Sequence, residues 1–170
     1  LATDGRASVV ERGLSEALRA RFPTDDPNDI DALLAGHAAY ADAMAKVAAN
    51  YPEDPGVGTL YADALMNTSP WNYWTPDRQP RADTPIIIRT LESVLAANPE
   101  HPGALHLYIH ATEAQDPGRA EDEADRLRPL MPGAGHLVHM PSHIYMQVGR
   151  YADAYAVNVD AARADENYLT

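Results

Sequence analysis

Hydrophobic positions along the chain recur at helical spacing. Between residues 29 and 51 the larger side chains fall three or four residues apart, which marks the buried stripe of one long helix. These side chains are Leu33, His37, Tyr40, Met44, Val47 and Tyr51. The same reasoning, with Pro-, Gly- and Asp-rich breaks, predicts eight helices, at 6–21, 29–50, 57–67, 84–98, 101–114, 117–129, 133–148 and 151–165. No segment alternates as a strand does, so we expect an all-α fold.

The breaks between the predicted helices also recur. Tyr51-Pro-Glu-Asp-Pro-Gly and Asn98-Pro-Glu-His-Pro-Gly are near copies 47 residues apart, and Pro132 follows Pro99 by 33 residues. Helical hairpins of about 34 residues in series indicate an α-solenoid. We expect a single helical-repeat domain over 1–170 with four hairpins. Their approximate bounds are 6–50, 55–98, 101–129 and 133–165, with a loop insertion at 68–83.

The last hairpin carries a family pattern, formed by Ser142, Tyr145, Gly149, Tyr151, Ala154 and Ala161. These residues stand at the steps that resemble a tetratricopeptide repeat (TPR). The preceding unit, around Pro117-Gly-Arg-Ala120, is a weaker match, and the first two hairpins match mainly by length. The resemblance implies a TPR-like α-solenoid whose first helices line a concave groove. The runs HLYIHATEA and GAGHLVHMPSHIY are further similar to bacterial TPR-containing proteins, which carry over no established reaction.

Six of the seven histidines lie between His101 and Tyr151. Apart from His101, they form two groups. The first is His106, His110 and Glu113, and the second is His136, His139 and His143. Residues three, four and seven apart share one face of a helix, so each group predicts a row of imidazoles on one helical stripe. Two histidines one turn apart are typical of transition-metal sites on helices.

The TPR resemblance implies that both stripes face the groove from neighbouring first helices. Helices pack 8–10 Å apart, so imidazoles from both can reach one ion. We therefore predict a transition-metal site formed by His106, His110, Glu113, His136, His139 and His143, with Zn, Cu or Fe as the ion. Pro141 lies inside the second stripe and removes one helical hydrogen bond. This loss costs little if the helix starts near Gly135. If the helix starts at Pro141 instead, His136 and His139 lie in a loop.

The predicted chemistry is metal-dependent hydrolysis or oxidation. A metal-bound water, Glu113 as ligand or general base, and Tyr108 or Tyr145 as hydrogen-bond donor would suit hydrolysis. Copper or iron would use similar ligands for a redox reaction, and the sequence does not separate the two. For both tyrosines a packing role is the alternative. The aromatic residues of the insertion, Trp71 and Trp74, predict either a lid over the groove or a plug in the core.

Composition limits the partners. The chain has 170 residues, 13 Lys and Arg against 25 Asp and Glu, a formal charge of −12 and no cysteine. This charge disfavours nucleic acid and anionic membrane surfaces, and the lack of cysteine excludes disulfides and thiolate zinc sites. No apolar run reaches the ~20 residues of a membrane-spanning helix. No compartment is indicated.

Three further readings compete with the metal enzyme. A TPR-like interaction module would bind a small molecule or peptide in the groove, with the histidines as contacts. A metal-storage or delivery protein would use the same ligands without catalysis, and a pH-responsive or incidental histidine groove would hold no ion. Because solenoid ends need covering, we also expect a homo-oligomer or flanking repeats.

Overall fold

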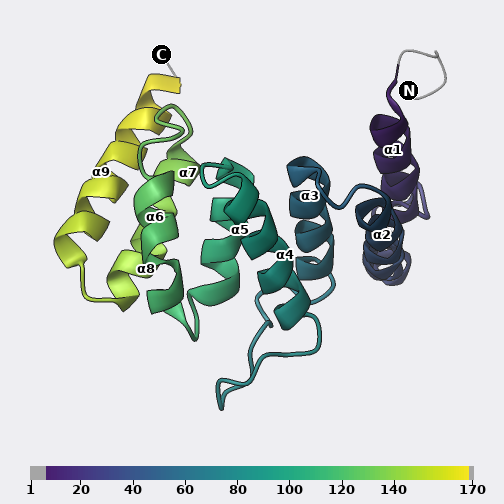
Figure 1. Ribbon diagram of the computed structural model, residues 1–170, viewed down its shortest axis with the longest axis horizontal. Helices are drawn as coiled ribbons and strands as arrows, with labels where there is room; N and C mark the ends of the chain where they lie inside the picture. Colours follow the sequence, from purple (N-terminus) through teal and green to yellow (C-terminus); the bar gives the residue numbers. More distant parts are fainter. Residues whose placement is uncertain (1–6, 169–170) are drawn as a thin grey trace. The chain divides into compact units, whose positions relative to one another are not determined.

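The computed structural model describes residues 7–168, and within them the chain is all helical (Figure 1). The helices are α1 (Val9–Arg21), α2 (Ile30–Asn50), α3 (Pro55–Met66), α4 (Thr84–Ala97), α5 (Pro102–Thr112), α6 (Glu121–Leu127), α7 (Gly135–His139), α8 (Pro141–Gln147) and α9 (Tyr151–Tyr168), with a 3₁₀ turn, η1 (Pro117–Ala120), before α6. All eight expected helices are present in the described chain. The seventh of them is divided into α7 and α8, and the described residues form no strand beyond one isolated bridge between Trp74 and Pro80.

The chain divides into two compact units, Leu1–Tyr73 and Trp74–Thr170. The boundary falls inside the insertion at 68–83. Helices α1, α2 and α3 belong to the first unit, and helices α4 to α9 belong to the second. None of the described helices is both long and apolar enough to cross a membrane.

The two near-identical breaks fold in the same way. Tyr51 and Asn98 each cap the end of a helix and are followed directly by a proline, and the proline four residues further on begins the next helix. Asp54 then caps α3 by accepting a hydrogen bond from the Val57 N–H, at 3.0 Å. In the second copy the imidazole of His101 takes this role for α5, accepting from the Ala104 N–H at 3.1 Å. A side-chain cap followed by proline at the first helical position is a strong start signal.

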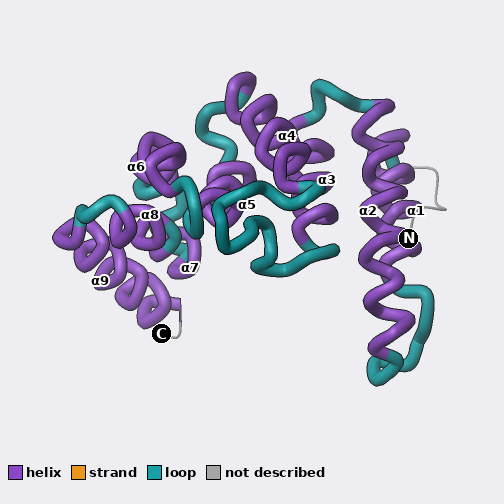
Figure 2. Tube along the Cα trace, turned by 90° about the horizontal axis from the view of Figure 1, so that it is seen from below, coloured by secondary structure: helices purple, strands orange, loops and turns teal. Residues whose placement is uncertain are grey.

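In the first unit, α1 and α2 form an antiparallel hairpin and α3 packs on α2 (Figure 2). The stripe expected on α2 is confirmed: Tyr40, Met44 and Val47 are buried, while Leu33 and His37 are half-buried. Gly36 is also buried, because its Cα lies against the end of α1. His37 contacts the carbonyl oxygen of Asn67 through its Nδ1, at 3.0 Å.

In the second unit, α5 lies at the centre of the packing and contacts α4, η1, α6 and α8. Its Leu105 and Ile109 are fully buried, as are Leu91 of α4, Leu127 of α6 and Ile144 of α8. Helices α7 and α8 both pack against α9. The side chains of α5 that do not enter this core include His106 and His110, which are half-buried.

Two local features position α7, α8 and α9. Pro141 interrupts the helix, but Met140 before it keeps helical dihedral angles (φ −51°, ψ −41°), so the chain continues along nearly the same path. Helix α7 begins at Gly135, as required for the lost hydrogen bond to cost little. Helix α8 ends at Gln147, and Gly149, two residues later, has a φ of 83° that favours glycine. There the Arg150 N–H returns to the Tyr145 carbonyl at 2.8 Å, which closes the helix end.

Candidate metal centre

Helix α5 presents one group of predicted site residues. His106 and His110 lie one turn apart, with ring centroids 4.8 Å from each other. Glu113 follows at the C-terminal cap of the helix. These steps of four and three residues put all three side chains on one face of α5.

Helices α7 and α8 present the other group. His136 and His139 lie on α7, and His143 lies in the first turn of α8. Because Met140 is helical in its backbone angles, the stripe continues across the interruption. The ring centroids of His139 and His143 are 4.8 Å apart, so proline does not separate them.

The two stripes meet, and the five imidazoles lie next to one another in a closed ring. Successive centroid distances are 5.0 Å for His136–His106, 4.8 Å for His106–His110, 5.6 Å for His110–His143, 4.8 Å for His143–His139 and 6.4 Å for His139–His136. The structure therefore brings together all five histidines that the sequence singled out.

Glu113 connects the stripes through its two carboxylate oxygens. Oε1 contacts Nδ1 of His110 at 3.0 Å, and Oε2 contacts Nδ1 of His143. The Glu113 side chain is only 16% exposed. Burial by itself raises the pKa of Glu113, but the hydrogen bonds from His110 and His143 outweigh it and lower the pKa to about 2. Glu113 is therefore a carboxylate that accepts from both imidazoles.

Asn158 of α9 is a partner that the sequence did not single out. Its Oδ1 lies 2.7 Å from Nδ1 of His139, and its Nδ2 donates to the carbonyl oxygen of Ala154 at 2.8 Å. The second contact fixes which end of the amide is the oxygen. Asn158 lies on the helix that follows the interruption and the turn, so helical periodicity within one element gives no signal for it.

Two pairs of Nε2 atoms face each other within the ring of imidazoles. Nε2 of His106 lies 3.1 Å from Nε2 of His136, and Nε2 of His139 lies 2.9 Å from Nε2 of His143. His106, His110 and His136 also form a three-residue group whose ligand atoms all lie within 4.8 Å of one another. Among the described residues, this group has the spacing to hold a metal ion.

Burial and crowding favour the neutral form of the His106 and His136 imidazoles. Burial first, and then the neighbouring His110, His136 and His143, lower the pKa of His106 to about 4. Burial and the neighbouring histidines also lower the pKa of His136, which Asp165 partly opposes. Neutral imidazole is the form that coordinates a metal ion. At neutral pH these two side chains can therefore coordinate a metal ion without first losing a proton.

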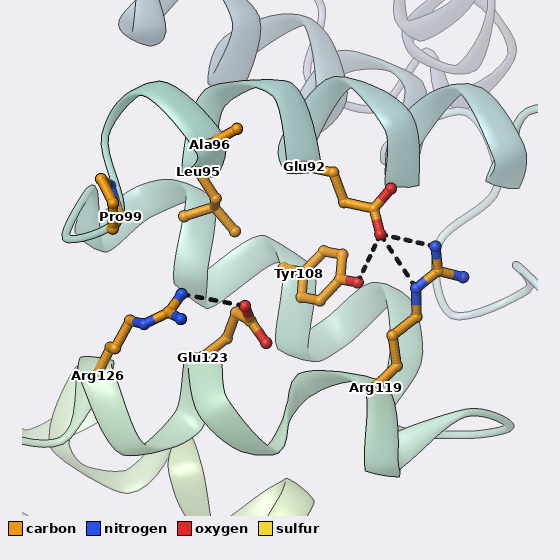
Figure 3. A pocket seen from close by; sticks show the side chains of 8 residues that line it. All are labelled: Glu92, Leu95, Ala96, Pro99, Tyr108, Arg119, Glu123 and Arg126. Carbon is orange, nitrogen blue, oxygen red and sulfur yellow. Dashed lines mark hydrogen bonds and ion pairs between the residues drawn. The ribbon is translucent and has the colours of Figure 1, made fainter.

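The two tyrosines expected to assist catalysis have other partners. The Tyr108 hydroxyl donates to Glu92 Oε1 at 2.9 Å, and Arg119 donates to the same oxygen at 2.6 Å (Figure 3). This contact borders a cavity of about 470 Å³ between α4, α5 and α6. The Tyr145 hydroxyl donates to Asp125 at 2.7 Å. Both side chains are buried, and these contacts favour the packing alternative over a catalytic role.

One of the two tryptophans of the insertion is anchored on α5. The Trp74 indole N–H donates to the carbonyl oxygen of Ala111 at 2.7 Å. This carbonyl belongs to the last turn of α5, where helical partners run out. Trp74 thereby gives a hydrogen-bond donor to a carbonyl at the end of the helix that carries His106 and His110. Trp71, in the other unit, is 70% exposed. The contact of Trp74 favours the plug over the lid.

Solved structures of MamA, a TPR-like helical protein, share this fold. A structure described as MamA MSR-1 aligns over 92% of this chain and 94% of that chain, with a TM-score of 0.57 and 17% sequence identity. One described as MamA AMB-1 aligns over 92% and 96%, with a TM-score of 0.58 and 19% identity. No protein-family model matches the sequence, and no curated protein matches it. At this identity the likeness shows the fold, a TPR-like α-solenoid.

Proposed function

We propose that this TPR-like protein binds a transition-metal ion through His106, His110 and His136. The observation that carries the proposal is the convergence of three imidazoles, from α5 and α7, with ligand atoms all within 4.8 Å of one another. Two nitrogens bound at 2.0–2.1 Å to a tetrahedral ion lie ~3.3 Å apart. The 3.1 Å separation of the His106 and His136 nitrogens is close to this value.

The surroundings of His110 suit it as a ligand. Its Nδ1 faces the Glu113 carboxylate, which only accepts hydrogen bonds, so Nδ1 carries the hydrogen and Nε2 is the nitrogen that would bind the ion. Metal-bound histidines commonly have such a carboxylate on the far nitrogen, which fixes the ring and strengthens the bond. In this proposal Glu113 orients His110 and His143 in place of binding the ion directly.

Nitrogen ligands without thiolate suit Zn, Cu or Fe in an exchangeable site. Three protein ligands leave a fourth position for water or substrate, which hydrolytic or oxidative chemistry would require. Of the expectations from sequence, the TPR-like fold supports a binding protein better than an enzyme. We therefore propose metal binding as the function of the centre. Hydrolytic or oxidative catalysis would be a more specific function of the same bound ion.

The test is metal titration of untagged protein followed by elemental analysis. We expect at least one equivalent of Zn²⁺ or Cu²⁺ to remain after gel filtration in the wild type and in the His37→Ala variant. His37 is the matched control, because it lies in the other unit. The triple variant His106→Ala, His110→Ala, His136→Ala should lose this ion while keeping its helical circular dichroism. Less than about 0.2 equivalents in the wild type would overturn the proposal.

A second candidate is an interaction module, favoured by the fold shared with MamA and by the net charge of −12. An acidic surface attracts basic segments, so we expect a Lys- and Arg-rich peptide to bind and an acidic peptide of equal length to fail. Fluorescence anisotropy at low and high salt measures both. Equal binding of the two peptides would count against this candidate and would leave the metal site unaffected.

A further inference from the structure

The second pair of imidazoles, His139 and His143, requires a positive charge between its two facing nitrogen atoms. Their Nε2 atoms face each other at 2.9 Å, which is hydrogen-bond distance. In a hydrogen bond one nitrogen must carry the hydrogen and the other must offer its lone pair. Which nitrogen carries it depends on what the Nδ1 atom on the far side of each ring contacts.

On the His139 ring, Nδ1 faces an acceptor. Asn158 Oδ1 lies 2.7 Å away, and its assignment as oxygen follows from the Asn158 Nδ2 bond to the carbonyl of Ala154. The Ser142 hydroxyl, at 3.3 Å, is a more distant partner. The closer contact requires the hydrogen on Nδ1 of His139, so that Nε2 of a neutral ring is a bare lone pair.

On the His143 ring, Nδ1 also faces an acceptor. It contacts Oε2 of Glu113, whose other oxygen, Oε1, contacts Nδ1 of His110 in the same way, so the carboxylate accepts on both sides. In a neutral His143 ring the hydrogen therefore also lies on Nδ1, and Nε2 is a second bare lone pair. Two lone pairs held 2.9 Å apart repel unless a positive charge lies between them.

We propose that a second transition-metal ion binds between His139 and His143, so that the cluster holds two ions. This inference rests on the proposed function, because it extends the centre of His106, His110 and His136. Two bonds of 2.0–2.1 Å to nitrogens 2.9 Å apart meet at an angle of about 90°, and an opening of ~0.4 Å would reach the tetrahedral separation. Asn158 and Glu113 hold the two rings in place for the ion.

The second ion is distinct from the first, because its ligands lie on the other side of the ring of imidazoles. The His136 and His139 centroids are 6.4 Å apart, and His143 lies 5.6 Å from His110. His139 and His143 leave further positions open to water or to a bridging group shared with the first ion. Metal pairs about 3.5–4 Å apart occur in enzymes that hold both oxygens of one reacting group.

The experiment measures stoichiometry in matched double variants of the full chain. Wild type, His139→Ala/His143→Ala and His106→Ala/His136→Ala are titrated with Cu²⁺ alone, and bound copper is counted after gel filtration. We expect two equivalents in the wild type and one in each double variant. We also expect magnetic coupling between the two Cu²⁺ ions in the electron paramagnetic resonance spectrum of the wild type only.

Each other outcome is informative. One equivalent in the wild type that the His139→Ala/His143→Ala variant retains would overturn the second ion and leave the proposed function intact, with a proton between the two nitrogens. One equivalent that both double variants lose would mean a single shared ion, which also overturns the inference. No copper in the wild type would overturn the proposed function itself. Retention of one ion by a double variant shows that its fold is preserved.

Discussion

At the scale of single residues, Glu113 holds the two histidine stripes in a fixed relation. Its two oxygens accept from Nδ1 of His110 on α5 and Nδ1 of His143 on α8. Both rings consequently turn Nε2 toward the other imidazoles. The sequence placed Glu113 correctly on the stripe of α5 but gave it the role of ligand or general base, whereas these contacts favour an orienting role.

The variant Glu113→Gln tests that role. An amide offers one oxygen and one NH₂ group, so it accepts from only one of the two Nδ1–H groups and opposes the other. We expect metal affinity to fall roughly 10–100-fold, as for other partners of metal-bound histidine. Competition with a chelator measures the affinity. If Glu113 is not a ligand, the visible bands of bound Co²⁺ keep their positions.

Glu92→Gln is the control for this variant. Glu92 also accepts from more than one donor, Tyr108 and Arg119, but it lies on α4 at the cavity away from the imidazoles (Figure 3). It should bind metal as the wild type does. An affinity of Glu113→Gln within twofold of the wild type would contradict an orienting role, and shifted Co²⁺ bands would show that Glu113 is a ligand.

Helical geometry alone predicts that Tyr108 and Tyr145 lie on the opposite helix faces from the histidines. Tyr108 lies two residues from both His106 and His110, and Tyr145 lies two residues from His143. Two residues on an α-helix turn through about 200°, so each tyrosine belongs to the opposite face of its helix. Their contacts with Glu92 and Asp125 agree with this geometry. The partners themselves depend on how helices pack and were beyond the sequence.

At the scale of elements, the helices and the two stripes were predictable because both depend on helical periodicity alone. The contact of His139 with Asn158 was not, because Asn158 lies on α9. Its position follows from the turn at Gly149 and from the packing of α7 and α8 on α9. The interruption at Pro141 was anticipated, but only the structure shows that Met140 keeps the stripe continuous.

The hairpin of α1 and α2 gives a prediction for the first unit. A Cβ at Gly36 would overlap the Arg21 carbonyl oxygen and lie 2.9 Å from Cδ of Pro23. Gly36→Ala should therefore lower the free energy of unfolding by about 1–3 kcal/mol. Gly13→Ala is the matched control on α1, because a Cβ there meets only the Val47 methyl groups at 3.8 Å. It should raise stability by about 0.5–1 kcal/mol.

Urea titration followed by far-ultraviolet circular dichroism measures both variants. Because α1 and α2 belong to the unit Leu1–Tyr73, neither change should alter metal stoichiometry. A Gly36→Ala variant as stable as the wild type would show that α1 and α2 can separate there at no cost.

At the scale of the whole molecule, the fold and the proposed metal centre are separate properties. The MamA structures share the fold at 17% and 19% identity, and a shared fold does not carry a site with it. The centre depends on side chains from α5, α7, α8 and α9 in the unit Trp74–Thr170. Among these side chains, the five histidines and Glu113 were predictable from their spacing in the sequence. The division of the chain into two units was not predicted.

This division predicts where a bound ion stabilises the protein. An ion that binds only the folded state adds about 2.7 kcal/mol at a concentration of 100 Kd. The bound ion suppresses only those local unfolding events that separate the imidazoles from one another. In hydrogen exchange followed by mass spectrometry, peptides from α5, α7, α8 and α9 should exchange up to about 100-fold more slowly with Zn²⁺ than with a chelator. Peptides from α1 and α2 should exchange equally in both. Slowing of similar size in α1 and α2, or in the His106→Ala/His110→Ala/His136→Ala variant, would show that the ion acts elsewhere.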